Sequence, residues 1–406
     1  MVSLHPDSGV AAQNVAKLDV VVIGGGPAGA TAAHDLARRG HAVALLDRAG
    51  RTKPCGGAVP PCLVRDFDIP FRLMVATATS ARMVSPSDRR LEMPIEGGYV
   101  GMVNRDEFDE WLRTRAAKAG ALRCTGTFER ITRDDEGTLV VHFKHADADK
   151  RNVTAVVRAR AAIGADGAPS RVARQEIPGA VREPFVYAYH EIVRSPEHAA
   201  RDVFDSARCD IYLGDTFSPD FYGWVFPHGP VTSVGAGSVN KGFSLRTAVT
   251  RLRSASGLDT VETVRREGAP IPFRTLKQWD NGRDVVLAGD AAGCASPASG
   301  EGIYYAMLSG RLAADAVDRL IVTGNTCELR SAQRRFMEQH GNTFRFLGLM
   351  QRFCYANDRR RERFIGMCRD ADFQKLAWAA YVHKQLAERR RLVYLRAFLK
   401  AYGTSS

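Results

Sequence analysis

The sequence predicts an α/β fold in which a Rossmann-like domain is interleaved with a second domain built on a mixed β-sheet, followed by a helical, basic C-terminal region. Three observations predict this arrangement. A strand–turn–helix–strand pattern fills the first fifty residues, strand and turn signals dominate residues 180–275, and a helical pattern begins near residue 326. The chain has no internal repeat and no low-complexity linker, so we expect the domains to interleave.

The Rossmann-like domain begins with LDVVVIGGGPAGATAAHDLARRG, residues 18–40. Its apolar run from Val20 to Ile23 predicts a buried strand, and the helix that follows carries small apolar residues on one face and ends at Gly40. The next segment, HAVALLDR, predicts a second buried strand that ends at Asp47. Together these elements form a βαβ unit. Residues 1–17, which precede it, have the character of a loose tail.

Later segments extend the same domain. RDEFDEWLRTRAAKA, near residues 105–119, predicts a helix, and GTLVVHF and ARAAIGADG predict strands. RDVVLAGDAAGCASPASGEGIYYAMLSGRLAADAV predicts a strand, a loop of small residues and a helix. We therefore expect a discontinuous nucleotide-binding domain, a substrate domain and a helical C-terminal region, made respectively of residues 18–60, 98–175 and 276–325, residues 61–97 and 176–275, and residues 326–406.

The composition is that of a globular protein, with 45% hydrophobic and 25% charged residues. No stretch approaches the roughly 18 unbroken apolar residues of a membrane-spanning helix, and the N-terminus lacks the pattern of a signal peptide. The eight cysteines are scattered, without a CxxC pair or a metal-ligand spacing. We therefore expect reduced thiols, no metal site and a cytoplasmic location.

A GxGxxG sequence, residues 24–29, joins the first strand to its helix. Gly24 permits the tight turn, Gly26 lets the backbone approach a pyrophosphate, and Gly29 lets helix and strand pack closely. The unpaired N–H groups of the helix N-terminus favour a phosphate. Asp47, 23 residues after Gly24, can accept hydrogen bonds from both ribose hydroxyls of an adenosine. We expect a dinucleotide site formed by Gly24, Gly26, Ala28, Gly29, Asp47 and Arg48.

Two further segments distinguish FAD from NAD. AIGADGAPSRV (162–172) and VVLAGDAAGCASPASGEGI (285–303) resemble the second and third motifs of the FAD-binding oxidoreductases typified by para-hydroxybenzoate hydroxylase. The resemblance implies that Asp290 lies at the ribityl and pyrophosphate part of FAD and that the loop before the next helix lies against the flavin ring. A helix N-terminus there stabilises negative charge on the reduced flavin. The additional cofactor-binding candidates are Arg105, Asp166, Asp290, Gly300, Gly302 and Ile303.

The electron donor is left open by the sequence. There is no second GxGxxG, so a dedicated nicotinamide-binding domain is not expected. The resemblance implies that NADPH would visit a cleft transiently. A ferredoxin-like donor is the alternative.

Two more segments resemble the geranylgeranyl reductase family. KPCGGAVPP (53–61) follows the Asp47 strand, and PDFYGWVFPHG (219–229) matches that family's P-x-x-Y-x-W-x-F-P pattern. With the FAD motifs, the resemblance covers roughly residues 18–325. It implies reduction of three double bonds of a geranylgeranyl chain to phytyl, on bacteriochlorophyll or on geranylgeranyl diphosphate. Ala58 replaces a glycine that is often found in the family, and His228 replaces a lysine, which leaves phosphate binding at that position open.

The chemistry of alkene reduction selects the candidate catalytic residues. A hydride must reach one carbon and a proton the other, so an acid must lie nearby. Tyr222 and Cys55 are the catalytic candidates, and His228 is a third possible acid. Strand alternation predicts Tyr222, Trp224 and Phe226 on one face, and Phe221 and Val225 on the other. Phe221, Trp224, Phe226 and His228 are the candidate substrate-binding residues.

Each of these assignments has an alternative. Cys55 could be a small buried hydrophobe, and Tyr222 could be a core tyrosine with a hydrogen-bonded hydroxyl. The whole chain could be an aromatic hydroxylase of the same fold or an archaeal-type isoprenoid lipid reductase, and a structural or redox-sensing flavin is a third possibility. A hydroxylase needs oxygen to form product, whereas a reductase works anaerobically.

The basic charge is concentrated near the C-terminus. The chain has a net charge of +12, and residues 326–406 contain 17 Lys and Arg against 7 Asp and Glu. DRRRERF (358–364) and ERRRLVYLRAF (388–398) place that charge beside aromatic and apolar residues, as an anionic membrane surface would favour. A solvated helix face explains it equally well, and nucleic acid is not expected because no recognition motif is present. We expect peripheral association with the inner or photosynthetic membrane.

Overall fold

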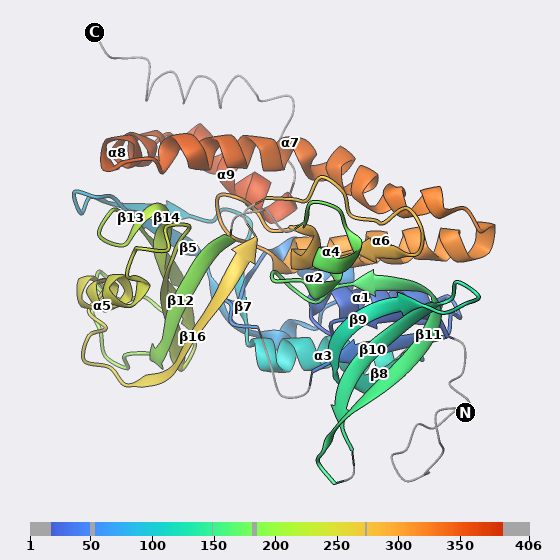
Figure 1. The fold of residues 1–406 in the computed structure, drawn as a ribbon. Helices are drawn as coiled ribbons and strands as arrows, with labels where there is room; N and C mark the ends of the chain where they lie inside the picture. The colour runs from blue at the N-terminus through green and yellow to red at the C-terminus, as the bar shows by residue number, and fades with distance from the viewer. Residues whose placement is uncertain (1–17, 49–52, 148, 181–184, 273, 385–406) are drawn as a thin grey trace.

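The structure is a computed structural model that describes residues 18–48, 53–147, 149–180, 185–272 and 274–384 (Figure 1). The expected N-terminal tail, residues 1–17, and the basic cluster at 388–398 lie outside the described residues. Two large sheets and one small sheet are covered by helices, as the α/β prediction required. In Figure 1 the two large sheets lie side by side, and the long helix α7 extends above both of them.

The first large sheet has the order β8-β2-β1-β11-β10-β9, with β17 paired to β11. Strands β2, β1, β11 and β17 run parallel, as in a Rossmann-like sheet. Val20 to Ile23 are buried, in keeping with the near-continuous apolar runs of parallel strands covered on both faces. The strands are β1 Leu18–Ile23, β2 Val43–Asp47, β8 Leu122–Thr125, β9 Thr127–Arg133, β10 Leu139–Ala146, β11 Asn152–Gly164 and β17 Val285–Leu287.

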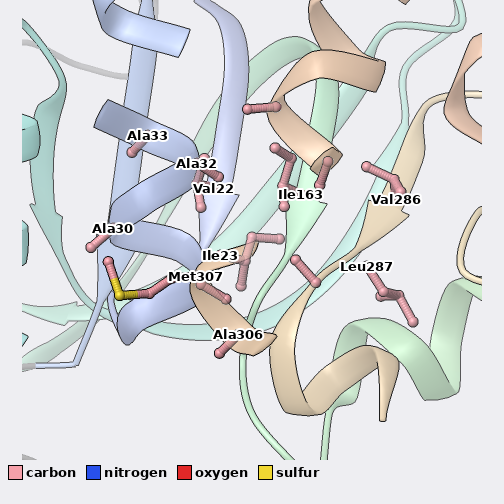
Figure 2. Packing of buried hydrophobic residues seen from close by; sticks show 14 of the residues in the cluster. Val22, Ile23, Ala30, Ala32, Ala33, Ile163, Val286, Leu287, Ala306 and Met307 are labelled. Carbon is pink, nitrogen blue, oxygen red and sulfur yellow. The ribbon is translucent and has the colours of Figure 1, made fainter. Parts of the chain in front are cut away.

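Helices α1 Pro27–Arg38 and α6 Ile303–Thr323 pack together on this sheet. Buried alanines on α1 leave room for the close approach of α6, and Figure 2 shows the buried side chains of β1, α1 and α6 gathered in one region of the core. The helix predicted near 105–119 is α3 Arg105–Lys118. A short helix, α4 Arg171–Glu176, follows β11.

The second large sheet has the order β16-β12-β15-β14-β13-β5-β6 and is mixed, because β13 pairs parallel with β5 whereas the other pairs are antiparallel. Helix α5 Leu245–Ala255 covers one face. The other face, which carries Tyr222 and Trp224, packs toward the C-terminal helices. The strands are β5 Ser80–Val84, β6 Arg90–Pro94, β12 Phe185–Arg194, β13 Arg208–Gly214, β14 Ser218–His228, β15 Val231–Ser238 and β16 Thr263–Pro272.

A three-stranded sheet, in the order β3-β7-β4, lies after the Cys55 segment. Its strands are β3 Ala58–Val59, β4 Met74–Ala78 and β7 Val100–Val103, and α2 Pro61–Phe67 follows β3. We retain the division into domains as a proposal. Each large sheet draws its strands from the segments expected for one domain, which supports it, whereas the small sheet takes strands from both.

The C-terminal region is helical, with α7 Arg330–Cys354, α8 Asp358–Met367 and α9 Ala371–His383. One expectation for this region was wrong. Arg361, in the cluster read as a basic surface, is fully buried, and its guanidinium binds Asp215 at 2.5 Å and also Asp358. A buried cation paired in this way anchors α8 to the second sheet rather than facing a membrane. Among the described helices, none is both long and apolar enough to cross a membrane.

Candidate active site

A cavity of about 460 Å³ lies between the two large sheets. Its walls come from the turn after β1, the segment around Cys55, the end of β11, strands β12 to β14, the loop before α6, and α9. Almost all of the residues singled out from the sequence line it. These are Gly24, Gly26, Ala28, Asp47, Arg48, Cys55, Arg105, Asp166, Phe221, Tyr222, Trp224, Phe226, Asp290, Gly300, Gly302 and Ile303.

The turn after β1 has the shape that a pyrophosphate requires. Gly24 has a φ of +107°, and a Cβ on Gly29 would lie 1.8 Å from the Gly24 oxygen, so neither position accepts a side chain. A Cβ on Gly26, in contrast, would meet no atom within 4 Å. Gly26 precedes α1 without a side-chain cap, so the first N–H groups of the helix face open space. Gly29 does not line the cavity, in keeping with a packing role.

Asp47 ends β2 at the same end of the cavity. Arg113 of α3 donates hydrogen bonds of 3.3 Å to the Asp47 Oδ2 atom and to the Gly25 carbonyl. The sequence does not single out Arg113, because it lies 66 residues after Asp47 and inside a helix, where no local pattern pairs it with that carboxylate. The carboxylate and the guanidinium together offer both acceptors and donors to a ribose.

The second and third FAD motifs, which contain Asp166 and Asp290, also line the cavity. The Asp166 carboxylate accepts hydrogen bonds from the Ser170 hydroxyl at 2.5 Å and the Arg171 N–H at 2.7 Å, so it also organises the start of α4. Burial raises the pKa of the Asp166 carboxyl. Asp290 forms an ion pair with Lys53, a cavity residue that sequence analysis did not single out. Gly302 precedes α6 without a side-chain cap, so a second helix N-terminus opens onto the cavity.

The cavity has the features that bound FAD would require. The two uncapped helix N-termini, at Gly26 and Gly302, lie on one cavity, and the cradle at Gly26 would be narrowed by any side chain. A dinucleotide flavin needs one such site for its pyrophosphate and benefits from another at its ring. The residues present therefore fit FAD.

Arg105 and Cys55 lie next to each other beside this cofactor region. Arg105 donates two hydrogen bonds to Asp109, at 2.8 and 2.7 Å, and the pair is nearly fully buried. Burial alone would lower the pKa of Arg105, but the Asp109 carboxylate raises it overall, so the guanidinium keeps its charge. The Cys55 Sγ atom accepts a 3.4 Å hydrogen bond from the Gly57 N–H, and its side chain faces the cavity.

Aromatic residues of β14 form the opposite wall. The rings of Tyr222 and Trp224 lie 6.0 Å apart, and those of Trp224 and Phe226 lie 6.3 Å apart. Val225 packs on the other face with α5, as alternation predicted. Phe221 departs from the prediction, because it also lines the cavity and stacks on Tyr222 at 4.3 Å. The pairing of β13 with β14 shifts between Tyr212 and Gly214, so strict alternation does not reach residue 221.

The hydroxyl of Tyr222 is already engaged. It donates a 2.5 Å hydrogen bond to the carbonyl of Ser299, in the loop before α6. Burial raises the pKa of Tyr222, so the proton is held more firmly than in an exposed tyrosine. This geometry favours a role for Tyr222 in fixing the loop over a role as a strong acid.

His228 is the one substrate-binding candidate that does not line the cavity. Its Nδ1 atom lies 3.0 Å from the Phe226 carbonyl, and its Nε2 atom lies 2.5 Å from where a Cβ on Gly57 would be. Burial lowers the pKa of His228, which favours the neutral ring. The side chain therefore packs beneath the Cys55 segment instead of reaching a substrate phosphate.

Helix α9 closes the cavity and was not foreseen. Trp378 and Tyr381 line it, and neither the Trp378 Nε1 nor the Tyr381 hydroxyl has a hydrogen-bond partner among the described residues. The Lys384 ammonium, just after α9, pairs with Glu301 of the loop before α6. The signal available in the sequence was the three-residue spacing of Trp378 and Tyr381, which places both rings on one helix face.

Comparisons with known proteins agree with this geometry. Residues 18–203 match the pyridine nucleotide-disulphide oxidoreductase family model. The chain is 51% identical to the geranylgeranyl diphosphate reductase of Rhodobacter capsulatus, covering 95% of this chain and 96% of that protein. It is 35% identical to the chloroplastic geranylgeranyl diphosphate reductase of Oryza sativa subsp. japonica, covering 96% and 86%.

Among solved structures, the fold resembles that of a geranylgeranyl bacteriochlorophyll reductase-like protein from Thermoplasma acidophilum, with a TM-score of 0.78, 22% identity and coverage of 96% and 98%. That likeness confirms the α/β fold and its helical C-terminal region. The identity to the curated relatives extends over nearly the full length of each chain. This protein belongs to the geranylgeranyl diphosphate reductase family.

Proposed function

We propose that this protein uses FAD to reduce three double bonds of a geranylgeranyl chain to phytyl, on bacteriochlorophyll or on the free diphosphate, in bacteriochlorophyll biosynthesis. One observation carries the proposal. A single cavity joins a dinucleotide cradle at Gly26 to a wall of aromatic side chains that includes Trp224 and Phe226. An apolar chain needs such a wall, since each unpaired polar group buried against it costs a few kcal/mol.

The chain's own residues would hold FAD along one side of this cavity. The α1 N-terminus and Asp47 would bind the pyrophosphate and ribose, and Gly300 to Gly302 would contact the flavin ring. Bound FAD supplies hydride to one carbon of the alkene. If protonation of the other carbon runs ahead, aromatic faces such as Trp224 stabilise the developing cation by on the order of 1–2 kcal/mol.

Cys55 and Tyr222 remain the candidates for the proton donor. Cys55 faces the cavity beside the charged Arg105. The Tyr222 hydroxyl donates a hydrogen bond to the Ser299 carbonyl, which supports a positioning role. We therefore favour Cys55 as the residue that moves the proton. NADPH visiting the cleft, or a ferredoxin-like protein, would reduce the flavin.

The test is mass spectrometry of the prenyl product. Protein loaded with FAD and supplied with NADPH or dithionite is incubated with geranylgeranyl bacteriochlorophyll, with geranylgeranyl diphosphate and with an archaeal-type geranylgeranyl lipid in parallel. We expect a product that has gained six hydrogens from one of the first two. A gain only on the lipid would assign the archaeal-type activity instead, and no gain on any of them would refute prenyl reduction.

We also propose that the enzyme works at an anionic membrane surface, because substrates this apolar reside in lipid. The exposed side of α7 supports this, since Leu349 is 67% exposed between the exposed Arg345 and Arg352. Cosedimentation with anionic and with neutral vesicles tests the proposal. Removal of residues 385–406 and the change Leu349→Ser should each reduce pelleting with anionic vesicles, and equal pelleting of both variants and wild type would contradict it.

A further inference from the structure

One buried ion pair joins the C-terminal helix to the loop that contacts the cofactor region. Glu301 lies between Gly300 and Gly302, and its side chain is 9% exposed, while that of Lys384 is 2% exposed. The Lys384 ammonium donates a hydrogen bond to Glu301 Oε2. The other oxygen, Oε1, is buried and has no hydrogen-bond partner among the described residues. The charge of this carboxylate is therefore balanced chiefly by Lys384.

Several contacts fix the position of Lys384. Its ammonium lies 4.1 Å from the ring centre of Tyr381 and 5.8 Å from that of Tyr305, within the range of cation–π attraction. Its backbone has a φ of +54°, which ends α9 in the left-handed conformation. His340 of α7 hydrogen-bonds to the Lys384 backbone. Lys384 is thus held from α6, α7 and α9 rather than resting on a surface.

Such a pair is weak evidence for stability, because desolvation of both charges offsets their attraction. Its position points to another role. We propose that Lys384 is a positioning residue for FAD: through Glu301 it fixes the Gly300–Gly302 backbone against the flavin ring and neutralises the carboxylate beside it. Lys384 would then set both FAD affinity and flavin reduction potential. This inference rests on the FAD part of the proposed function and not on the identity of the substrate.

Removal of either charge should change the relative affinity for reduced and oxidised FAD in a defined direction. Reduction places negative charge on the flavin, and an unneutralised Glu301 carboxylate next to Gly300 and Gly302 would oppose it. Lys384→Met should therefore weaken binding of reduced FAD more than that of oxidised FAD. Glu301→Gln leaves the ammonium unpaired and should strengthen the binding of reduced FAD relative to that of oxidised FAD. In the double variant neither charge remains, so the ratio of the two affinities should return close to that of wild type.

The experiment measures the affinity of full-length protein for oxidised FAD by flavin fluorescence and the reduction potential of bound FAD by dye-coupled titration. For Lys384→Met we expect about a tenfold weaker binding of oxidised FAD and a further tenfold loss for reduced FAD. That further loss corresponds to a potential about 30 mV more negative for a two-electron couple. Glu301→Gln should move the potential in the positive direction.

The matched control is Lys375→Met, which removes the same charge from an exposed position of α9 and should leave the potential unchanged. If Lys384→Met lowers only the melting temperature and leaves the potential at the wild-type value, the pair is merely structural and the inference fails. If Lys384→Met does not fold, Glu301→Gln alone decides through the sign of its shift. If the reduction potential shifts with the expected sign but the protein reduces no prenyl chain, the proposed substrate is refuted and this inference still holds.

Discussion

The two ends of the cavity are built in different ways. The nucleotide end comes largely from contiguous segments, since β1, the Gly24 turn, α1 and β2 all lie within residues 18–47. The other end, where we propose that the prenyl chain binds and which we call the prenyl end, combines β14 with α9. Trp224 of β14 and Trp378 of α9 lie far apart in the sequence. Backbone geometry dictates the first end, and side-chain packing between distant elements dictates the second. Changes at the two ends should therefore fail in different ways.

The largest effect is expected at the nucleotide end. Gly29→Ala would place a Cβ 1.8 Å from the Gly24 oxygen, a backbone contact that cannot give way, so we expect loss of both FAD binding and folding. Gly26→Ala meets no protein atom within 4 Å and should fold with a normal melting temperature but bind FAD poorly. Thermal unfolding of the apoproteins and FAD titration check this. Equal melting temperatures for the two variants would contradict the account.

Acid should weaken the packing of α7 against α6 around His340. Burial lowers the pKa of His340 to about 4, against about 6.5 in the unfolded chain. Between pH 6.5 and 4, His340 binds a proton in the unfolded state but not in the folded state. The contribution of neutral His340 to the free energy of unfolding is therefore fully present above pH 6.5 and is lost as the pH drops toward 4. The loss is at most about 3 kcal/mol. Urea unfolding at several pH values measures it.

The groups around His340 sharpen this pH test. The rings of Tyr304 and Tyr305 and the Lys384 backbone face it, and none of these groups gains or loses a proton between pH 4 and 6.5. His340→Gln should therefore flatten the dependence of stability on pH in that window. An unchanged slope in this variant would show that another group is responsible.

A smaller effect is expected from Trp378→Ala. Removal of this ring widens the prenyl end without touching the Gly26 cradle, so the KM for the prenyl substrate should rise about tenfold while the FAD affinity stays the same. Trp111 is a tryptophan of similar burial outside the cavity, and Trp111→Ala is the control. Weakened FAD binding in Trp378→Ala alone would mean that the two ends are not separable.

The smallest effect is expected from Tyr222→Phe. Loss of one hydrogen bond to the Ser299 carbonyl costs about 1 kcal/mol, or roughly fivefold in turnover. A general acid would instead contribute on the order of 10²- to 10⁴-fold. Single-turnover reduction of the substrate by the pre-reduced protein distinguishes the two roles. A thousandfold loss would restore Tyr222 as the proton donor and displace Cys55.

The sequence predicted the elements of the nucleotide end better than those of the prenyl end. The first strand, the helix that ends near Gly40 and the position of Asp47 at the end of β2 were predicted correctly, because each depends on local pattern and on glycine geometry. The helix beginning at Arg105 was likewise predicted from its own periodicity. No distant contact is needed to infer any of these.

The remainder depends on tertiary structure. Phe221 faces the cavity because of a shift in strand pairing, and His228 is turned beneath Gly57 by packing. Arg361 belongs to a cluster that we expected to be surface charge, and the sequence does not single out Lys384. Both are buried and paired, Arg361 with Asp215 and Lys384 with Glu301, 83 residues away. Composition and periodicity carry no information about such pairings. The spacing of Trp378 and Tyr381 puts both rings on one helix face, but only the structure shows that this face of α9 lines the cavity.

Our proposal requires that bound flavin passes its electrons to an isoprenoid double bond inside this cavity. The most direct measurement mixes anaerobic, chemically reduced protein with geranylgeranyl bacteriochlorophyll or with geranylgeranyl diphosphate and follows the flavin absorbance in a stopped-flow instrument. We expect the flavin to reoxidise without oxygen and one double bond to be saturated for each flavin oxidised. A flavin that stays reduced until oxygen is admitted, and then yields an oxygenated product, would contradict it.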